Sequence, residues 1–340
     1  MNKSVLLGTL TTVGLAAGAA AAGTLDDVKA RGTLNCGVTT GLVGFAAPDA
    51  NGEWNGFDVS VCRAVAAAVL SDPSAVEFVP TTGKTRFTAL ASGEIDMLAR
   101  NTTWTFSRDV DLKFTFVGVN YYDGQGFMVP KALGVSSAKE LDGATVCIQT
   151  GTTTELNLAD FFRSNNISYE PVPIETNAEA QQQYLAGACD VYTTDASGLA
   201  ATRATFEAPG DHALLPEIIS KEPLGPLVRH GDDEWGDVVR WTLNALITAE
   251  ELGVTSANVA SLSEAANPAT PEINRLLGTE GNLGEMLGVD ADWAAKALAA
   301  GGNYGEIFAK NIGEETPVAL ARGLNAQWTE GGLIYSPPFR

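Results

Sequence analysis

Histidine is nearly absent from this chain of 340 residues, in which only His212 and His230 occur. No Ser/His/Asp or Cys/His arrangement can be recognised around them, so the sequence gives no support for nucleophilic catalysis or metal chemistry. The chain also lacks a glycine-rich phosphate loop, and its four cysteines form no C-x-x-C pair of the kind that binds zinc. We therefore expect neither a metal ion nor an organic cofactor.

Basic residues are scarce as well. The chain has 21 Lys and Arg residues against 41 Asp and Glu residues, which gives a formal net charge of −20. So acidic a chain repels phosphate backbones, and nucleic acid is not an expected partner. Anionic membrane surfaces are poor partners for the same reason. The alternative is that the acidic excess serves solubility alone.

Long apolar runs are missing after the N-terminus. Residues 1–22 combine a positive start at Lys3, an apolar core over residues 5–17 and small residues up to Ala22, which is typical of a secretory signal. We predict cleavage near Ala22. No later stretch approaches the about 18 apolar residues of a membrane helix, so the mature chain is expected to be soluble and exported.

The even number of cysteines in an exported chain favours disulfide bonds. Four cysteines allow three pairings. We predict the pairs Cys36 with Cys62 and Cys147 with Cys189, because each closes a local loop within one half of the chain. In the chain-entropy model, loops of this length stabilise the fold by roughly 3–4 kcal/mol each.

Strand and helix patterns alternate along the chain, and the order occurs twice. Strands are predicted at residues 33–38, 76–80 and 95–99 in the first set and at residues 144–149, 168–172 and 189–193 in the second set. Amphipathic helices are predicted between them, for example over residues 59–70 and 178–186. Strands that alternate with helices indicate an α/β fold with parallel sheets covered by helices. We therefore predict two lobes of the same plan.

The predicted domain boundaries follow this repeat. Residues 23–122 form the first part of lobe 1, residues 123–225 form lobe 2, and residues 226–340 return to lobe 1 and add a helical extension. Pro- and Gly-rich crossings suggest hinges near residues 121–126 and 224–227. The extension consists of helical pieces with glycine breaks, and its packing on either lobe is left open.

The stretch from Arg100 to Arg108 follows the third predicted strand. Asn101 and Thr103 supply side-chain donors and acceptors there, and Arg108 supplies a planar fork that suits a carboxylate. The alternative is an ordinary polar turn with a surface arginine.

Lobe 2 offers a complementary set. Thr152 and Thr153 lie at a predicted helix start, where free N–H groups favour an anion; plain helix capping is the alternative. Asp195 ends a strand and can hold an ammonium group, or cap the helix that follows. Opposite charges on facing lobes are complementary to a zwitterion.

Several motifs resemble a known family. They are Gly56-Phe57-Asp58-Val59-Ser60-Val61, the strand and loop from Ile95 to Arg108, Gln149-Thr150-Gly151-Thr152-Thr153, Val119-Asn120-Tyr121-Tyr122-Asp123-Gly124-Gln125-Gly126-Phe127 and Gly331-Gly332-Leu333-Ile334-Tyr335-Ser336-Pro337-Pro338-Phe339-Arg340. Together they resemble the polar amino-acid-binding proteins of bacterial ABC importers, and within these the general L-amino-acid-binding branch. The resemblance covers nearly the whole mature chain.

The resemblance implies roles for the residues at the matching positions. Arg108 would bind the ligand α-carboxylate, and Thr153 with the backbone N–H groups near Thr152 would bind the same group from lobe 2. Asp195 would hold the α-ammonium group. Asn101 and Thr103 would assist it.

The sequence departs from the family pattern at three positions. Ser60 replaces an acid at an expected surface position, Thr39 replaces the aspartate of cation-selective relatives, and Leu42 replaces an aromatic clamp. These changes argue against a strict binder of basic amino acids and suggest a tolerant pocket for the ligand side chain. The expected lining of that pocket is Thr39, Thr40, Leu42, Gln149 and Tyr122.

The resemblance thus implies a two-lobed type II periplasmic-binding-protein fold whose lobes are joined by a two-strand hinge. It implies a periplasmic monomer, not an enzyme, that captures L-amino acids with broad specificity and delivers them to an ABC permease in the inner membrane. Two alternatives remain open: an exported enzyme like cyclohexadienyl dehydratase on the same fold, and a binding protein that serves only a chemosensory receptor.

Overall fold

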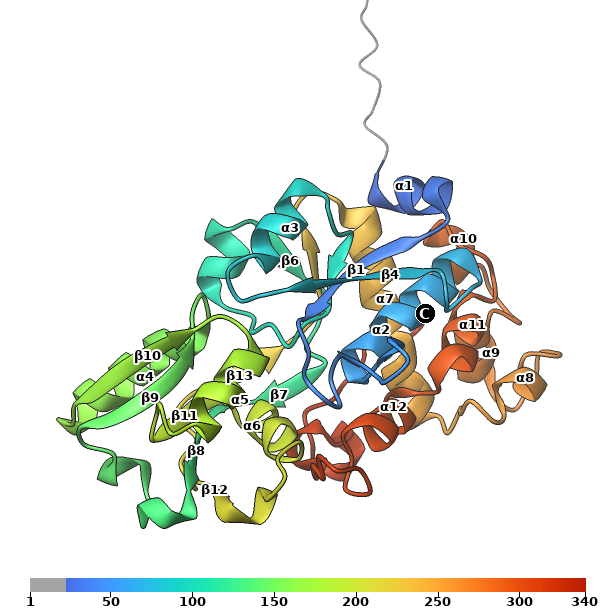
Figure 1. Ribbon diagram of the computed structural model, residues 1–340. Coiled ribbons are helices and arrows are strands. Elements are labelled where there is room, and N and C mark those ends of the chain that lie inside the picture. Colours follow the sequence, from blue (N-terminus) through green and yellow to red (C-terminus); the bar gives the residue numbers. More distant parts are fainter. Residues whose placement is uncertain (1–22) are drawn as a thin grey trace, which may run out of the picture.

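The computed structural model describes residues 23–340, and the predicted signal peptide lies outside this range. Two lobes lie side by side and are joined by a narrow connection, with the C-terminal helices packed on the larger lobe (Figure 1). Within residues 23–340, none of the helices combines the length and the apolar character that a membrane crossing needs.

Lobe 1 is built on a five-stranded sheet in the order β4-β1-β5-β14-β6. Its strands are β1 (Leu34–Thr39), β4 (Val76–Thr81), β5 (Met97–Leu98), β6 (Phe114–Phe116) and β14 (Leu227–Arg229), and a hairpin of β2 (Ala47–Pro48) and β3 (Trp54–Asn55) is attached. Strand β14 runs antiparallel to both of its neighbours, and the other four strands share one direction.

The helices of lobe 1 are α1 (Thr24–Arg31), α2 (Phe57–Leu70), α3 (Arg86–Ser92) and α7 (Asp233–Glu251), with a short π-helical turn η1 (Ser107–Asp111). The apolar faces of α2 and α7 bury Val61, Val65 and Trp235 against the sheet, as the helical spacing predicts. Helix α7 begins where the sequence indicates a cap, because the Asp232 carboxylate accepts a hydrogen bond from the Trp235 amide at 3.3 Å.

Lobe 2 has a sheet of the same plan, in the order β10-β9-β11-β8-β12. Its elements are β8 (Gln125–Pro130), β9 (Ala144–Gln149), α4 (Thr153–Asn165), β10 (Tyr169–Ile174), α5 (Asn177–Leu185), β11 (Val191–Asp195), α6 (Ala196–Arg203) and β12 (His212–Leu214). Here β8 runs against the other four strands. Two separate cores fill the two faces, one under α4 and one under α5, so the predicted α/β fold with mostly parallel sheets is confirmed.

Two short strands connect the lobes. Strand β7 (Tyr121–Asp123) pairs antiparallel with β13 (Glu222–Leu224), and Asp123 lies opposite Glu222. The first crossing lies within the predicted hinge at residues 121–126, whereas the second begins two residues before the predicted segment 224–227. Movement of the lobes about these strands remains a prediction.

Both predicted disulfide bonds are confirmed, and each lies within one lobe. Cys36 of β1 is joined to Cys62 of α2, and Cys147 of β9 is joined to Cys189, two residues before β11. The first bond fixes a helix on its sheet, and the second joins a strand to the approach of its neighbour.

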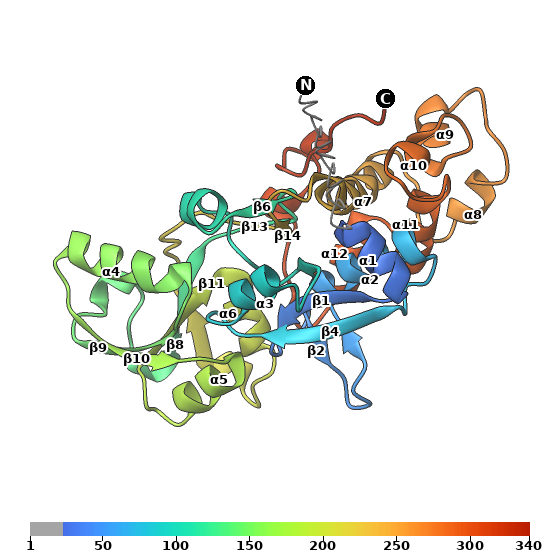
Figure 2. The ribbon, with the colours of Figure 1, turned by 90° about the horizontal axis from the view of Figure 1, so that it is seen from above.

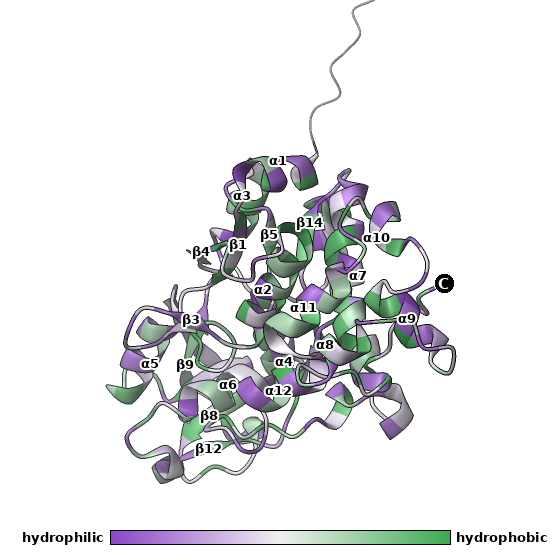
Figure 3. Cartoon of the chain, turned by 90° about the vertical axis from the view of Figure 1, so that its right-hand side faces the viewer, coloured by the Kyte–Doolittle hydropathy of each residue, from purple (hydrophilic) through white to green (hydrophobic). Residues whose placement is uncertain are grey.

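The C-terminal extension packs on lobe 1, which answers the question that the sequence left open. Its helices are α8 (Val259–Leu262), α9 (Pro271–Leu277), α10 (Leu283–Met286), α11 (Trp293–Gly301) and α12 (Tyr304–Asn311), followed by the short 3-10 turns η5 (Gly323–Asn325) and η6 (Trp328–Glu330). Three similar turns lie in lobe 2: η2 (Lys131–Leu133), η3 (Ala138–Glu140) and η4 (Pro209–Asp211). Helix α11 lies along α2, where small residues such as Ala64 and Ala297 let the two approach closely. Hydrophobic and hydrophilic residues alternate along these helices (Figure 3).

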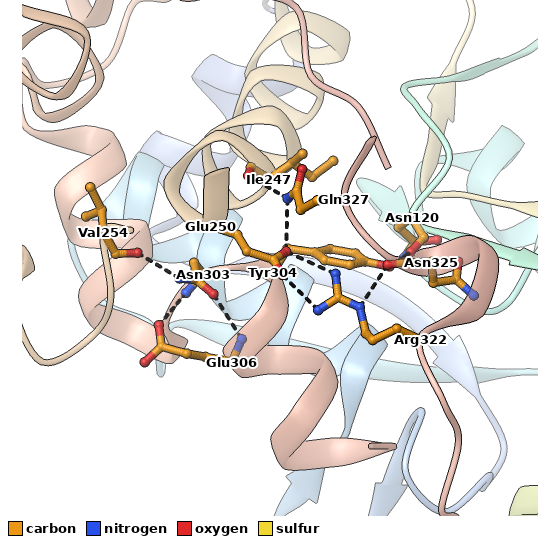
Figure 4. A network of polar contacts seen from close by, with 10 residues as sticks. All are labelled: Asn120, Ile247, Glu250, Val254, Asn303, Tyr304, Glu306, Arg322, Asn325 and Gln327. Atoms are coloured by element: carbon orange, nitrogen blue, oxygen red, sulfur yellow. Dashed lines mark hydrogen bonds and ion pairs between the residues drawn. The ribbon is translucent and has the colours of Figure 1, made fainter. Parts of the chain in front are cut away.

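A polar network ties the extension to the hinge (Figure 4). The Asn325 side chain accepts from the Tyr122 amide at 2.6 Å and donates to the Tyr122 carbonyl at 3.1 Å. Arg322 forms a two-point ion pair with Glu250, and the Tyr304 hydroxyl donates to the Asn120 carbonyl at 2.9 Å. The extension therefore holds strand β7 from outside the cleft.

The chain end anchors the extension through one aromatic side chain. Phe339 is buried, and its ring centre lies 5.0 Å from that of Trp241. We expect Phe339→Ala to lower the free energy of unfolding by about 3 kcal/mol, because the cavity left behind cannot close fully. Urea denaturation would measure this, with Tyr335→Ala as control because Tyr335 is 62% exposed. Equal losses in both variants would contradict the assignment.

Candidate functional site

A cavity lies between the lobes at the ends of β1, β5, β9 and β11. It is lined from lobe 1 by Thr39, Leu42, Arg86, Arg100, Asn101 and Thr103, and from lobe 2 by Gln149, Thr152, Thr153, Thr154, Asn177, Tyr192, Thr194, Asp195 and Gly198. Figure 2 shows lobe 2, with α4, β9 and β10, beside the lobe 1 strands β1 and β4. Asn177 donates across it to the Gly41 carbonyl at 3.1 Å, so the lobes are in contact and the cleft is closed.

The structure brings together most of the residues singled out in the sequence. Eight of them line the cavity: Thr39, Leu42, Asn101, Thr103, Gln149, Thr152, Thr153 and Asp195. Three do not: Thr40, Arg108 and Tyr122. The cavity is also lined by seven residues that the sequence did not indicate: Arg86, Arg100, Thr154, Asn177, Tyr192, Thr194 and Gly198.

The stretch after β5 is fixed in position by the hinge rather than forming a surface turn. The Trp104 amide donates to the Pro223 carbonyl at 2.8 Å, and the Gly225 amide donates to the Thr102 carbonyl at 3.0 Å. Asn101 has a φ of 29°, which is an uncommon conformation. Its backbone N–H stabilises this conformation by donating a hydrogen bond to Asp58 Oδ2 at 3.1 Å. Among the described residues, the buried Asn101 Oδ1 has no hydrogen-bond partner. An acceptor is thus available in the lobe 1 wall.

Two buried guanidinium groups line the same cavity. Arg86 donates to Thr102 Oγ1 at 3.2 Å and to the Gly151 carbonyl of lobe 2 at 3.3 Å, and its buried Nε has no partner within residues 23–340. Arg100 donates to the Thr81 carbonyl at 3.1 Å. Burial lowers the pKa of Arg86 well below its usual range and lowers the pKa of Arg100 to about 10. Arg100 therefore remains cationic at neutral pH.

Arg108 lies behind the cavity wall. Its Nη1 donates to the Thr103 carbonyl at 2.9 Å, and its guanidinium carbon lies 5.2 Å from the centre of the Phe87 ring. Burial lowers the pKa of Arg108 to about 10, while Glu222 and Asp195 oppose that shift. The predicted two-point contact of Arg108 with a ligand carboxylate stays a prediction.

Asp195 is the one acidic side chain among the described residues that line the cavity. It ends β11, and it makes no side-chain capping hydrogen bond to α6, so the structure gives no support to the capping alternative. Burial raises the pKa of Asp195 well above its usual range; Asp123 and Glu222 raise it further, and Arg86 and Arg108 oppose them. Such a carboxylate becomes more stable when a cation joins it.

Helix α4 directs its N-terminus at the cavity. Neither threonine there serves as a cap: Thr152 Oγ1 donates to the Gln149 carbonyl at 2.7 Å, and Thr153 Oγ1 donates to Glu222 at 3.0 Å. The first backbone N–H groups of this helix therefore remain available, and the helix dipole favours an anion beside them.

The expected side-chain pocket is only partly present. Thr39, Leu42 and Gln149 line the cavity together, and the Gln149 side chain accepts from the Tyr192 hydroxyl at 3.2 Å. Thr40 does not reach the lining, and Tyr122 is held at the hinge through its backbone by Asn325.

The chain is similar to known proteins along its whole length. It is 65% identical over 340 residues to the glutamate/glutamine/aspartate/asparagine-binding protein BztA of Rhodobacter capsulatus and 57% identical over 344 residues to the general L-amino acid-binding periplasmic protein AapJ of Rhizobium johnstonii, with 100% of each chain covered. A solved periplasmic binding protein of an ABC transporter from Brucella ovis, with glutathione bound, is 56% identical and has a TM-score of 0.90 over 94% of this chain and 100% of that one.

A family match spans both lobes. Residues 34–257 match the bacterial extracellular solute-binding proteins, family 3, from β1 to beyond α7. The close relatives are binding proteins rather than enzymes, and the resemblance expected from the sequence is confirmed. The chain belongs to the bacterial extracellular solute-binding proteins, family 3.

Proposed function

We propose that this protein captures L-amino acids in the cleft and delivers them to an ABC permease. The observation that carries the proposal is a pair of buried atoms without hydrogen-bond partners among the described residues: the donor Arg86 Nε and the acceptor Asn101 Oδ1. Both residues line the same cavity as the acid Asp195. Buried polar atoms without partners are rare in folded proteins. A ligand that brings an acceptor to Arg86 Nε and an ammonium group to Asn101 Oδ1 satisfies both atoms.

The orientation of the ligand follows from the distribution of charge. Its α-ammonium group contacts Asp195, with Asn101 and Thr103 as further acceptors. Its α-carboxylate contacts Arg108 and the free N–H groups at Thr152 and Thr153. This arrangement supports recognition of the head group that all L-amino acids share.

Arg100 leaves cationic charge for the ligand side chain, and Arg86 leaves a free N–H donor for it. We infer that acidic side chains and their amides bind well, while Thr39, Leu42 and Gln149 tolerate others. The printed names of the relatives, which bind glutamate, glutamine, aspartate and asparagine in one case and L-amino acids in general in another, support this breadth. The glutathione in the Brucella ovis structure carries the same free α-amino acid group.

The protein would act in the periplasm as a monomer after removal of residues 1–22. The relative named as periplasmic supports this location. The second candidate function is that of a binding protein that serves only a chemosensory receptor. Loss of growth on amino acids after deletion of the gene would favour import, and unchanged growth with lost chemotaxis would favour sensing.

A ligand screen tests the proposed function. Thermal-shift measurements would cover the twenty L-amino acids, several D-amino acids and several sugars. A ligand at a hundredfold excess over its dissociation constant adds about 2.7 kcal/mol of stability, so a true ligand raises the melting temperature clearly. We expect shifts with many L-amino acids and none with sugars. Absence of a shift with every L-amino acid would refute the proposal.

Binding should release a proton from Asp195 where the raised pKa keeps this group protonated in the free protein. Burial raises the pKa of Asp195 in the free protein, and an ammonium ligand lowers it again, so the proton leaves on binding and affinity falls as the pH decreases through the raised pKa. Calorimetry in two buffers with different ionisation enthalpies would measure the release. A binding heat that is independent of the buffer would contradict it.

A further inference from the structure

Glu222 is a buried carboxylate that accepts hydrogen bonds from both lobes. It lies on the hinge strand β13, is 2% exposed and does not line the cavity. A buried acid on a hinge strand is costly unless its oxygens are satisfied. Its surroundings therefore indicate what it does.

Every hydrogen bond that its carboxylate makes is one that it accepts. Oε1 accepts from Asn157 Nδ2 at 2.7 Å and from Ser220 Oγ at 2.6 Å. Oε2 accepts from Thr153 Oγ1 at 3.0 Å and from Thr103 Oγ1. Four donors fill the roughly four lone-pair sites of a carboxylate, so the group is fully used.

The consequence lies in the two threonines, which face each other across the cleft with their hydroxyl oxygens 3.5 Å apart. A hydroxyl group has one hydrogen to donate, and both threonines donate theirs to Glu222. Only lone pairs are left to face the cavity. The Thr103 hydroxyl is therefore an acceptor for an ammonium group and cannot donate to a carboxylate.

We propose that Glu222 is a positioning residue that fixes the Thr103 hydroxyl as an acceptor and thereby selects α-amino acids over their α-hydroxy and α-carboxy analogues. The inference rests on the proposed function, because it assigns Thr103 to the ammonium side of the ligand. A glutamine at position 222 presents an NH₂ group that donates to Thr103 Oγ1. The Thr103 hydrogen then turns to the cavity and opposes an ammonium group.

The test compares L-glutamate with L-2-hydroxyglutarate, which differ only in the group at the α-carbon. Competition calorimetry gives the ratio of their dissociation constants. Glu222→Gln should reduce the preference for L-glutamate at least tenfold, and Thr103→Val should reduce it as well. In the Thr103→Val background, Glu222→Gln should have no further effect. Ser220→Ala is the matched control, because it removes a donor to Oε1 and leaves Oε2 untouched.

Each outcome bears on the proposal. An unchanged ratio in Glu222→Gln, or an equal change with and without the Thr103 hydroxyl, overturns it and leaves Glu222 a purely structural group. If Glu222→Gln does not fold, the Thr103→Val variant decides the test, and an unchanged ratio of dissociation constants in it overturns the proposal. Failure of the wild-type protein to bind L-glutamate or any other L-amino acid would instead refute the proposed function.

Discussion

Asp195→Asn should abolish measurable binding of every L-amino acid, with losses of about 2–5 kcal/mol. The substitution keeps the shape of the side chain and removes the one acid among the described lining residues. The ligand ammonium group would then be buried without a counter-charge. Because all L-amino acids carry this group, alanine and glutamate should lose equal free energy in calorimetry.

The same substitution should leave the ligand-free protein as stable or more stable. Burial raises the pKa of Asp195 well above its usual range, so folding with this carboxyl group at neutral pH costs free energy, and its neutral replacement removes that cost. Thermal unfolding would therefore separate a lost contact from a lost fold. Asp160→Asn is the control, because Asp160 is an exposed lobe 2 residue. Loss of only some ligands would show that Asp195 does not hold the shared group.

Arg108→Ala should also abolish binding of all L-amino acids alike, at a loss of about 2–5 kcal/mol. The ligand α-carboxylate would lose its cationic partner, and Glu222 and Asp195 would lose a nearby positive charge. Arg108→Lys should restore only part of the affinity, because an ammonium group cannot make the planar two-point contact of a guanidinium.

Arg86 provides the comparison for this prediction. Arg86 lines the cavity and has a free Nε among the described residues, whereas Arg108 lies behind Thr103. We expect Arg86→Met to affect ligands with acidic side chains most. If Arg86→Met abolished binding of all ligands and Arg108→Ala spared it, the α-carboxylate would have to be reassigned to Arg86. The exposed Arg163 serves as a control for the loss of a positive charge.

Much of the fold follows from local sequence pattern. The predicted strand at residues 144–149 coincides with β9, and Asp232 caps α7 as its sequence indicates. The disulfide pairing is also local, because each bond links neighbouring elements of one lobe. Short-range periodicity and caps carry this information.

The residues that the sequence did not indicate reach the site through contacts between distant segments. Arg86 begins a short helix and contacts Gly151, 65 residues away, so nothing near it in the sequence marks a site. Glu222 lies in a Pro-rich crossing that also contains Glu217 and Lys221, so its charge does not single it out, and its partner Thr103 lies 119 residues away. The extension was not placed because its apolar helix faces fit either lobe. Tertiary contacts determine which residues line the site and where the extension packs, and local patterns in a single sequence do not predict these contacts.

The position of β14 has a consequence for the order of assembly. All five strands of the lobe 2 sheet lie between Gln125 and Leu214, whereas the lobe 1 sheet needs β14, at residues 227–229, between β5 and β6. A chain that is synthesised from its N-terminus can therefore complete lobe 2 while the lobe 1 sheet still lacks the inner strand β14. Contacts between distant segments form slowly, so lobe 1 should reach its native state after lobe 2.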